Sequence, residues 1–153
     1  MKSTIEFIIL DFVTLQCYSL DMKEYLAFKG LKFIVEWYFD KKGQSQPLDF
    51  FNNLSMIEQQ KFFHLVKRIG DFGFISDKTK FRNEDDGIYA FKPQPNRFLS
   101  FFYEGGKIII TYAFIKKSQK LKKQDKACAL TAREDYANRV KEGSYYDKDY
   151  EYI

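Results

Sequence analysis

Lysine and arginine side chains gather at the ends of three neighbouring apolar segments in the second half of the chain. Lys92 closes the first segment, Arg97 opens the second, and Lys116 and Lys117 close the third. Short turns between these segments predict an antiparallel meander, which brings these side chains to one end of a sheet. The topology therefore predicts a cationic cluster, with no buried carboxylate partner nearby in the sequence.

A cationic cluster of this kind can bind a phosphodiester, and it can also catalyse the cleavage of RNA, in which the 2′-hydroxyl is an internal nucleophile. Lysine can accept or donate a proton when neighbouring positive charges lower its pKa. Arginine can stabilise the negative charge that develops on the phosphoryl oxygens. This chemistry requires no metal ion and no cofactor. A solvated basic surface, or a patch that binds a protein, is the alternative explanation for the same charges.

The positive charge continues beyond the third segment. The dipeptide Gly105-Gly106 marks a turn, and the β-branched run 107–115 that follows it predicts a buried strand. Five lysines then lie within eight residues, at positions Lys116, Lys117, Lys120, Lys122 and Lys123. Like charges this close together repel one another, and a bound anion offsets that repulsion. Phosphate is the most obvious anion.

Length and composition restrict the possible classes of protein. The chain has 153 residues and a formal net charge of +4, which fits one domain with a mildly basic surface. Its two cysteines, Cys17 and Cys128, have no metal-ligand spacing, and its one histidine is His64. This inventory argues against a disulfide framework, a zinc site or a histidine-based hydrolytic triad, and it fits a cytoplasmic protein. The apolar stretch 5–15 contains Asp11 and is too short to span a membrane.

Hydrophobic periodicity and turn residues predict the order of the secondary structure. We expect a strand at 31–40, helices at 47–54 and 55–73, strands at 87–92, 97–103 and 107–115, and a helix at 124–141. Ser55 and Glu58 form a capping-box pattern at the start of the second helix, and Gly73 suits its end. The predicted fold class is α+β, with a small antiparallel β-sheet, an N-terminal helical hairpin and a C-terminal helix.

The chain divides at two points where the composition changes. We assign residues 1–21 to an N-terminal extension and residues 22–143 to a single domain. Residues 144–153 are predicted to form a frayed C-terminal tail. The alternative for the extension is that Met22 is the biological start of the protein. Within the domain, periodicity predicts that Trp37 lies in the core, that His64 is partly buried on a helix and that Cys128 is a packed thiol.

Several of these segments resemble one family of proteins. The stretch Tyr112–Lys120 is similar to a strand that ends in a Phe-x-Lys-Lys-Ser/Thr-Gln-Lys signature. The strand Gly87–Lys92, followed by Arg97, is similar to that family's pair of basic strands, and the helical segment Ala127–Arg133 resembles its last helix. Over residues 31–139 these features resemble the RelE/HigB group of toxins from type II toxin–antitoxin systems, and in particular its HigB-like, phage-associated branch.

The resemblance implies a RelE-like fold and a small endoribonuclease (an mRNA interferase) that cuts messenger RNA, usually in the A site of the ribosome. Its partner would be a helix-turn-helix antitoxin that silences it. Arg97 would then stabilise the phosphate, Lys92 would act as a base or stabilise charge, and Lys117 would be a second cationic contact. The other lysines of the cluster would bind RNA, namely Lys116, Lys120, Lys122 and Lys123. The general acid has no clear match, and Tyr136 fits the core as well as it fits this role.

Two other functions fit the same residues. A toxin of the gyrase-directed ParE branch would use the basic loop to bind a protein rather than RNA. A non-catalytic module of the same fold would bind nucleic acid or a partner without cutting anything, and its affinity for RNA would fall steeply with salt.

Overall fold

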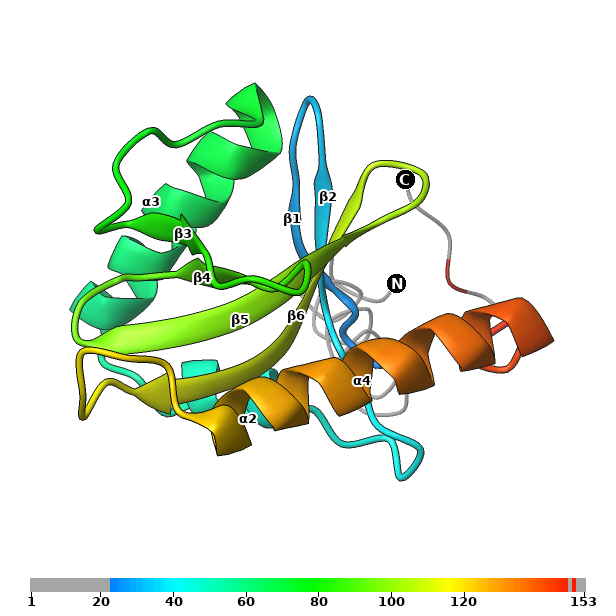
Figure 1. The fold of residues 1–153 in the computed structure, drawn as a ribbon. Coiled ribbons are helices and arrows are strands. Elements are labelled where there is room, and N and C mark those ends of the chain that lie inside the picture. The colour runs from blue at the N-terminus through cyan, green and yellow to red at the C-terminus, as the bar shows by residue number, and fades with distance from the viewer. Residues whose placement is uncertain (1–22, 149, 151–153) are drawn as a thin grey trace, which may run out of the picture.

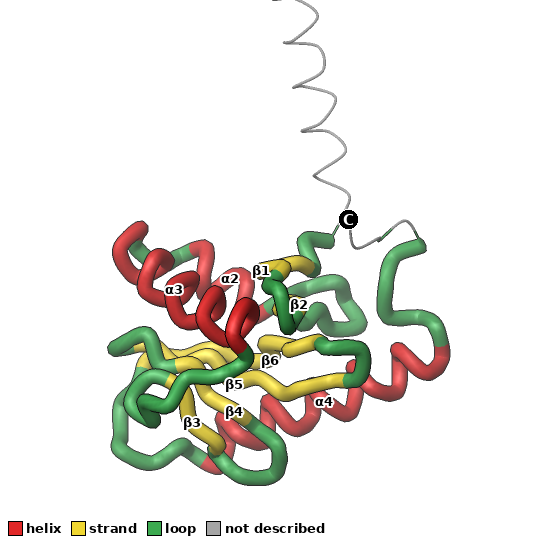
Figure 2. Tube along the Cα trace, turned by 90° about the horizontal axis from the view of Figure 1, so that it is seen from above, coloured by secondary structure: helices red, strands yellow, loops and turns green. Residues whose placement is uncertain are grey.

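A six-stranded sheet forms the centre of the molecule in the computed structural model, which describes residues 23–148 and 150 (Figure 1). The predicted extension at residues 1–21, and the alternative start at Met22, therefore lie outside the described residues. The strands are β1 (Leu26–Lys29), β2 (Ile34–Trp37), β3 (Phe81–Asn83), β4 (Tyr89–Phe91), β5 (Asn96–Tyr103) and β6 (Lys107–Ile115). Their order is β1-β2-β6-β5-β4-β3, in which β2 and β6 are parallel and the other neighbours are antiparallel. Helices α2 (Gln46–Asn52) and α3 (Met56–Phe72) lie on one face of the sheet, and α4 (Lys123–Glu142) lies on the other (Figure 2).

This sheet shows that the predicted small antiparallel sheet with an N-terminal helical hairpin is wrong. The sheet is mixed, and the described residues begin with the strands β1 and β2 rather than with a pair of helices. The sequence pattern does not reveal β1 and β3, because strands of four and three residues are too short to show a clear alternation. The parallel pairing of β2 with β6 joins segments that are distant in the sequence, so turn residues give no sign of it.

Local signals in the sequence determine where α2 and α3 begin and end. Ser45 caps α2, because its hydroxyl oxygen accepts a hydrogen bond from the backbone N–H of Leu48 at 3.4 Å. At the start of α3, the Ser55 hydroxyl accepts from the Glu58 N–H at 3.3 Å, and the Glu58 carboxylate accepts from the Ser55 N–H at 3.2 Å. Helix α3 ends at Gly73, whose φ of 76° lies in the left-handed region that favours glycine. The predicted capping box and helix end are confirmed.

Aromatic rings fill the core between α3 and the sheet. Trp37 on β2 stacks on Phe62 of α3, with ring centroids 5.3 Å apart and an interplanar angle of 20°. Phe62 also contacts Phe98 on β5, at 4.3 Å between centroids. Trp37 is only 2% exposed, so its predicted place in the core is confirmed. The predictions of a partly buried His64 and a packed Cys128 are wrong, because each residue lies beside the buried stripe of its helix and is exposed.

Tyrosine side chains attach the segment after α4 to the rest of the domain. Tyr136 of α4 is fully buried and contacts the ring of Tyr145 edge-on, at 4.6 Å and 72°. The Tyr145 hydroxyl accepts a hydrogen bond from the Phe39 N–H at 2.9 Å, and its carbonyl oxygen accepts from the Tyr25 hydroxyl at 3.2 Å. Tyr145 is 1% exposed, so the predicted fraying is wrong for this part of the tail. A tyrosine ring buries a large apolar area once its hydroxyl has a hydrogen-bond partner. The many polar residues of the tail therefore predict fraying although its tyrosines can pack into the core.

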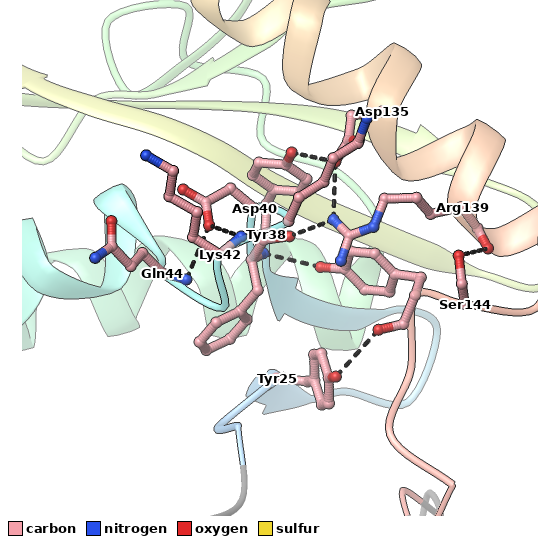
Figure 3. A network of polar contacts seen from close by, with 11 residues as sticks. Tyr25, Tyr38, Asp40, Lys42, Gln44, Asp135, Arg139 and Ser144 are labelled. Carbon is pink, nitrogen blue, oxygen red and sulfur yellow. Dashed lines mark hydrogen bonds and ion pairs between the residues drawn. The ribbon is translucent and has the colours of Figure 1, made fainter.

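A charged network fastens α4 to the segment that follows β2 (Figure 3). Arg139 donates hydrogen bonds from Nη1 to the Asp135 carboxylate at 2.8 Å and to the Phe39 carbonyl oxygen at 2.9 Å. The Tyr38 hydroxyl donates to the same carboxylate. Burial alone raises the pKa of Asp135, but the hydrogen bonds from Tyr38 and Arg139, together with nearby positive charge, hold this pKa below its ordinary value. The ionised carboxylate therefore stabilises the folded state.

We predict that Asp135→Asn lowers the free energy of unfolding by about 1 to 3 kcal/mol near neutral pH, because it weakens charged, partly buried hydrogen bonds. The folded-state pKa of Asp135 lies below the unfolded-state value. The carboxylate's contribution is therefore present above about pH 4 and is lost as the pH falls through the folded-state pKa. Chemical denaturation at neutral pH and at about pH 3 measures the difference, which should shrink in acid. Glu134→Gln, at an exposed neighbouring carboxylate, is the control, and equal losses in both variants would contradict this role.

Candidate active site

Figure 1 shows that the end of β4, the start of β5 and the end of β6 lie beside the chain that leads into α4. Residues of these segments line a pocket of about 280 Å³. Among the described residues that line it, six carry a positive charge and one carries a negative charge. The positive residues are Lys78, Arg82, Lys92, Arg97, Lys116 and Lys120, and the negative residue is Glu84. We call this site the cationic pocket. Such an excess of positive charge in a concave site favours the binding of an anion.

Strand pairing determines the positions of three of these side chains. Arg97 lies near the start of β5, beside the end of β6 in the antiparallel pair. Directly after β6, the Lys116 N–H donates to the Pro95 carbonyl oxygen at 3.0 Å, which ties the lysine loop to the turn before β5. Lys92 follows β4, and its N–H donates to the Lys80 carbonyl oxygen at 2.8 Å. The structure therefore brings Lys92, Arg97 and Lys116 into one pocket.

Arg97 lines the pocket although it is only 6% exposed. Its Nη1 atom donates to the Gln94 side-chain oxygen at 3.2 Å and to the Asn96 carbonyl oxygen at 2.9 Å. Burial lowers the pKa of the Arg97 guanidinium, and the nearby Glu84 opposes that effect. A guanidinium nevertheless remains charged in proteins. Arg97 is therefore a fixed positive charge that is already oriented before an anion binds.

Lys92 and Glu84 form an ion pair inside the cationic pocket. Lys92 Nζ lies 3.6 Å from Glu84 Oε1, and the two side chains are 13% and 16% exposed. Burial lowers the pKa of Lys92, the positive charges of Arg97 and Arg82 lower it further, and Glu84 raises it. The resulting pKa lies below the ordinary value for lysine. The expectation of no carboxylate partner is wrong, because Glu84 directly follows the unforeseen strand β3.

A left-handed turn after Glu84 leads from β3 to β4. Asp85 and Asp86 have φ angles of 69° and 54°, a region that residues with a Cβ rarely adopt. Two residues of helix α4 contact this turn. Lys126 Nζ lies 2.8 Å from the Asp86 carboxylate, and Arg133 donates a hydrogen bond to the Asp86 carbonyl oxygen. Helix α4 therefore helps to fix the position of Glu84, whose carboxylate pairs with Lys92.

The other predicted site residues lie at different places. Lys120 lines the cationic pocket, whereas Lys117 and Lys122 are exposed in the loop between β6 and α4 and do not line it. Lys123 begins α4 and lines a neighbouring hollow of about 300 Å³, which Lys120 also lines. Tyr136, the candidate acid, is buried away from the pocket, and its hydroxyl lies 2.6 Å from that of Tyr146.

Three charged residues of the pocket are absent from the prediction, namely Lys78, Arg82 and Glu84. All of them lie in the polar stretch 76–86, which the sequence predicts to be a loop. Pairing of Arg82 on β3 with Ala90 on β4 brings this stretch to the site. A strand of three residues leaves too little alternation in the sequence to signal that pairing.

Every charged residue of the cationic pocket lies within a region that matches a known family. The family of phage-derived proteins described as Gp49-like (DUF891) matches residues 49–134, which is more than half of the chain. The chain belongs to this family. The Gp49-like family is toxin-like and related to the RelE/HigB group, which confirms the resemblance at that level without assigning the chain to HigB. No curated protein matches the chain.

The described part of this Gp49-like protein contains no group of three or more histidine, cysteine, aspartate or glutamate residues that could hold a metal ion. None of the helices in residues 23–148 has the length and apolar character that crossing a membrane requires.

We predict that Glu84→Gln increases the affinity of this Gp49-like protein for single-stranded RNA by about 2- to 10-fold at low salt, because it removes the negative charge from the pocket wall. Fluorescence anisotropy with a labelled oligouridine measures the change, which should diminish as the salt concentration rises. Glu104→Gln, at an exposed carboxylate in the β5–β6 turn, is the matched control and should have little effect. Unchanged or weaker binding by Glu84→Gln would show that RNA does not enter this pocket.

Proposed function

We propose that this Gp49-like protein is the toxin of a toxin–antitoxin system and that it cleaves messenger RNA on the ribosome without a metal ion. The expected partner is a helix-turn-helix antitoxin that silences it. One observation carries the proposal: Arg97, a buried guanidinium, and Lys92, a lysine whose pKa is lowered, share one cationic pocket. A fixed positive charge beside a potential base is a combination that can catalyse the cleavage of a phosphodiester.

Arg97 supports the binding of a phosphate group. Both of its hydrogen bonds to Gln94 and Asn96 come from Nη1, so they do not use Nη2 or Nε. A guanidinium carries five N–H donors, and a phosphate can accept two of them in parallel. Because Arg97 is largely withdrawn from water, its interaction with a bound phosphate is stronger than it would be on an open surface.

The reaction that fits these residues is a transesterification of RNA. The 2′-oxygen attacks phosphorus, its proton passes to a neutral Lys92 amine, and the bond to the 5′-oxygen breaks. The products are a 2′,3′-cyclic phosphate and a 5′-hydroxyl, which takes its proton from an ammonium group of the pocket, Lys116 or Lys120. The lowered pKa increases the neutral fraction of Lys92, and Arg97 stabilises the charge on the phosphoryl oxygens.

Lysines outside the pocket guide the RNA backbone in this proposal. Lys117, Lys122 and Lys123 are exposed along the loop and at the start of α4, where they can contact phosphates on either side of the cleaved bond. Exposed lysines contribute mainly salt-dependent attraction without sequence preference. We therefore assign Lys117 to RNA binding beside the pocket rather than to the reaction itself.

We predict that inducing the wild-type protein in cells creates new messenger RNA 5′ ends within reading frames. Arg97→Lys should reduce these cuts by about 100-fold or more, because lysine lacks the planar fork that holds a phosphate in one orientation. Mapping of 5′ ends measures the effect, and circular dichroism confirms that the variant is folded. Arg68→Lys, at an exposed arginine of α3, is the control and should cut like the wild type.

The other outcomes of this experiment point to the alternative functions. Growth arrest without cuts would indicate another target, such as gyrase, and would overturn the proposal. RNA binding without arrest or cuts would indicate a non-catalytic module of the same fold, and it would also overturn the proposal.

We predict that the cleavage rate rises with pH until Lys92 is neutral, because the neutral amine is the proton acceptor. Glu84 raises the pKa of Lys92, so Glu84→Gln should lower that pKa and move the rising limb to lower pH. Single-turnover cleavage of a short messenger RNA on ribosomes, measured across the pH range, checks both statements. A limb that persists unchanged in Lys92→Gln would show that another group accepts the proton.

A further inference from the structure

Aromatic side chains form a row across the sheet, on the face that carries α3. Phe102 on β5 contacts Tyr89 on β4, with ring centroids 5.0 Å apart, and Tyr89 stacks on Phe81 of β3 at 5.6 Å. Phe33, just before β2, also contacts Phe102, at 5.3 Å. Phe102 is 39% exposed, so this part of the row is not fully covered by α3 or by another described element.

A groove of about 580 Å³ lies between this row and the loop that follows α3. We call it the aromatic groove. Phe74, in that loop, lines the groove and is 68% exposed. Phe72 at the end of α3 and Leu31 in the β1–β2 turn are 66% and 89% exposed. Large apolar side chains that are exposed close together mark an interaction site.

A contact between two glycines fixes the end of α3 at the side of the groove. The Gly70 carbonyl oxygen accepts hydrogen bonds from the N–H groups of Lys32 and Phe33, at 2.8 and 2.9 Å. A Cβ atom on Gly30 would lie 2.2 Å from the Gly70 carbonyl carbon, so the two backbones touch directly. The helix then stops at Gly73, before it can cover the aromatic row.

The surroundings of the groove favour an acidic and extended partner. Lys78 and Arg82 line the groove, and its described lining includes no aspartate or glutamate. The side chain of Lys32 lies beside Gly73 at the same end of α3. Strand β3 is the last strand of the described sheet, so its outer edge offers backbone N–H and C=O groups to an added strand.

We propose that the aromatic groove binds an extended segment of a partner protein. The segment pairs with the edge of β3, places apolar side chains against Phe74 and Phe81, and directs acidic side chains to Lys78 and Arg82. RNA suits the groove less well, because the strand edge offers pairing to a neutral backbone rather than to phosphates.

The same segment reaches the cationic pocket. Lys78 and Arg82 line both the aromatic groove and the cationic pocket, so a partner's carboxylates at these residues neutralise charge that RNA requires. Binding of a protein segment would therefore weaken binding of RNA. This inhibitory effect rests on the proposed function, whereas the docking itself does not.

Two synthetic peptides of equal length test the docking. One alternates leucine and valine with glutamate, and the other has lysine in place of glutamate. Fluorescence anisotropy with the full chain should show that the acidic peptide binds at least about 10-fold more tightly. Phe74→Ser should weaken that binding by about 10-fold or more. Ile57→Ser is the matched control at the opposite end of α3, because Ile57 is 67% exposed and Phe74 is 68% exposed.

The other outcomes overturn the proposal. Equal binding of both peptides, or binding that Phe74→Ser leaves unchanged, would show that the groove has no acidic protein partner. A loss of oligouridine affinity in Phe74→Ser would assign the groove to RNA, and the loss of a dimer would assign it to a second copy of the chain. Peptide binding requires no cleavage, so absence of RNA cuts with intact peptide binding would overturn only the proposed function.

Discussion

The rest of the structure depends on the burial of strand β6 on both of its faces. Ile108, Ile109 and Ile110 are 0% exposed, because α2 and α3 cover one face of the sheet and α4 covers the other. Each such side chain contributes about 1.5 to 3 kcal/mol when it leaves water. A shift of one residue would turn every side chain of the strand to the opposite face, so the register is fixed. That register brings Lys116, just beyond β6, to Arg97 on the neighbouring strand.

The sequence predicts those parts of the fold that local residues encode. The run 107–115 is a strand because β-branched residues follow a glycine turn, and α3 starts at its capping box. The meander is local as well, which explains why Lys92, Arg97 and Lys116 lie in one pocket. Lys117, which the sequence predicts in the same cluster, lies outside that pocket. Strand β3 depends instead on pairing with β4, and Glu84 becomes part of the pocket only through that pairing. Tertiary contacts of this kind leave no periodic signal.

The cationic pocket combines two requirements that oppose each other. A site for phosphate needs an excess of positive charge, but such an excess destabilises the protein while the site holds no anion. Glu84 relieves part of that repulsion through its ion pair with Lys92, and contacts from α4 to Asp86 hold the turn in place. Helix α4 therefore helps to maintain the charge balance of the pocket, because it holds the turn next to Glu84 although it does not carry Arg97.

The contact between Gly30 and Gly70 affects which side chains can be substituted without moving the end of α3. The position of the end of α3 is set there by backbone atoms, so it does not depend on the side chains that are exposed in the aromatic groove. Side chains that line the aromatic groove, such as Phe74, can therefore be exchanged without reshaping the frame that presents them. Phe74 lies in the loop after α3, so its exchange leaves strand β5, which holds Arg97, unchanged. Exchange of Phe74 can therefore change the surface of the aromatic groove while the cationic pocket keeps all of its lining residues.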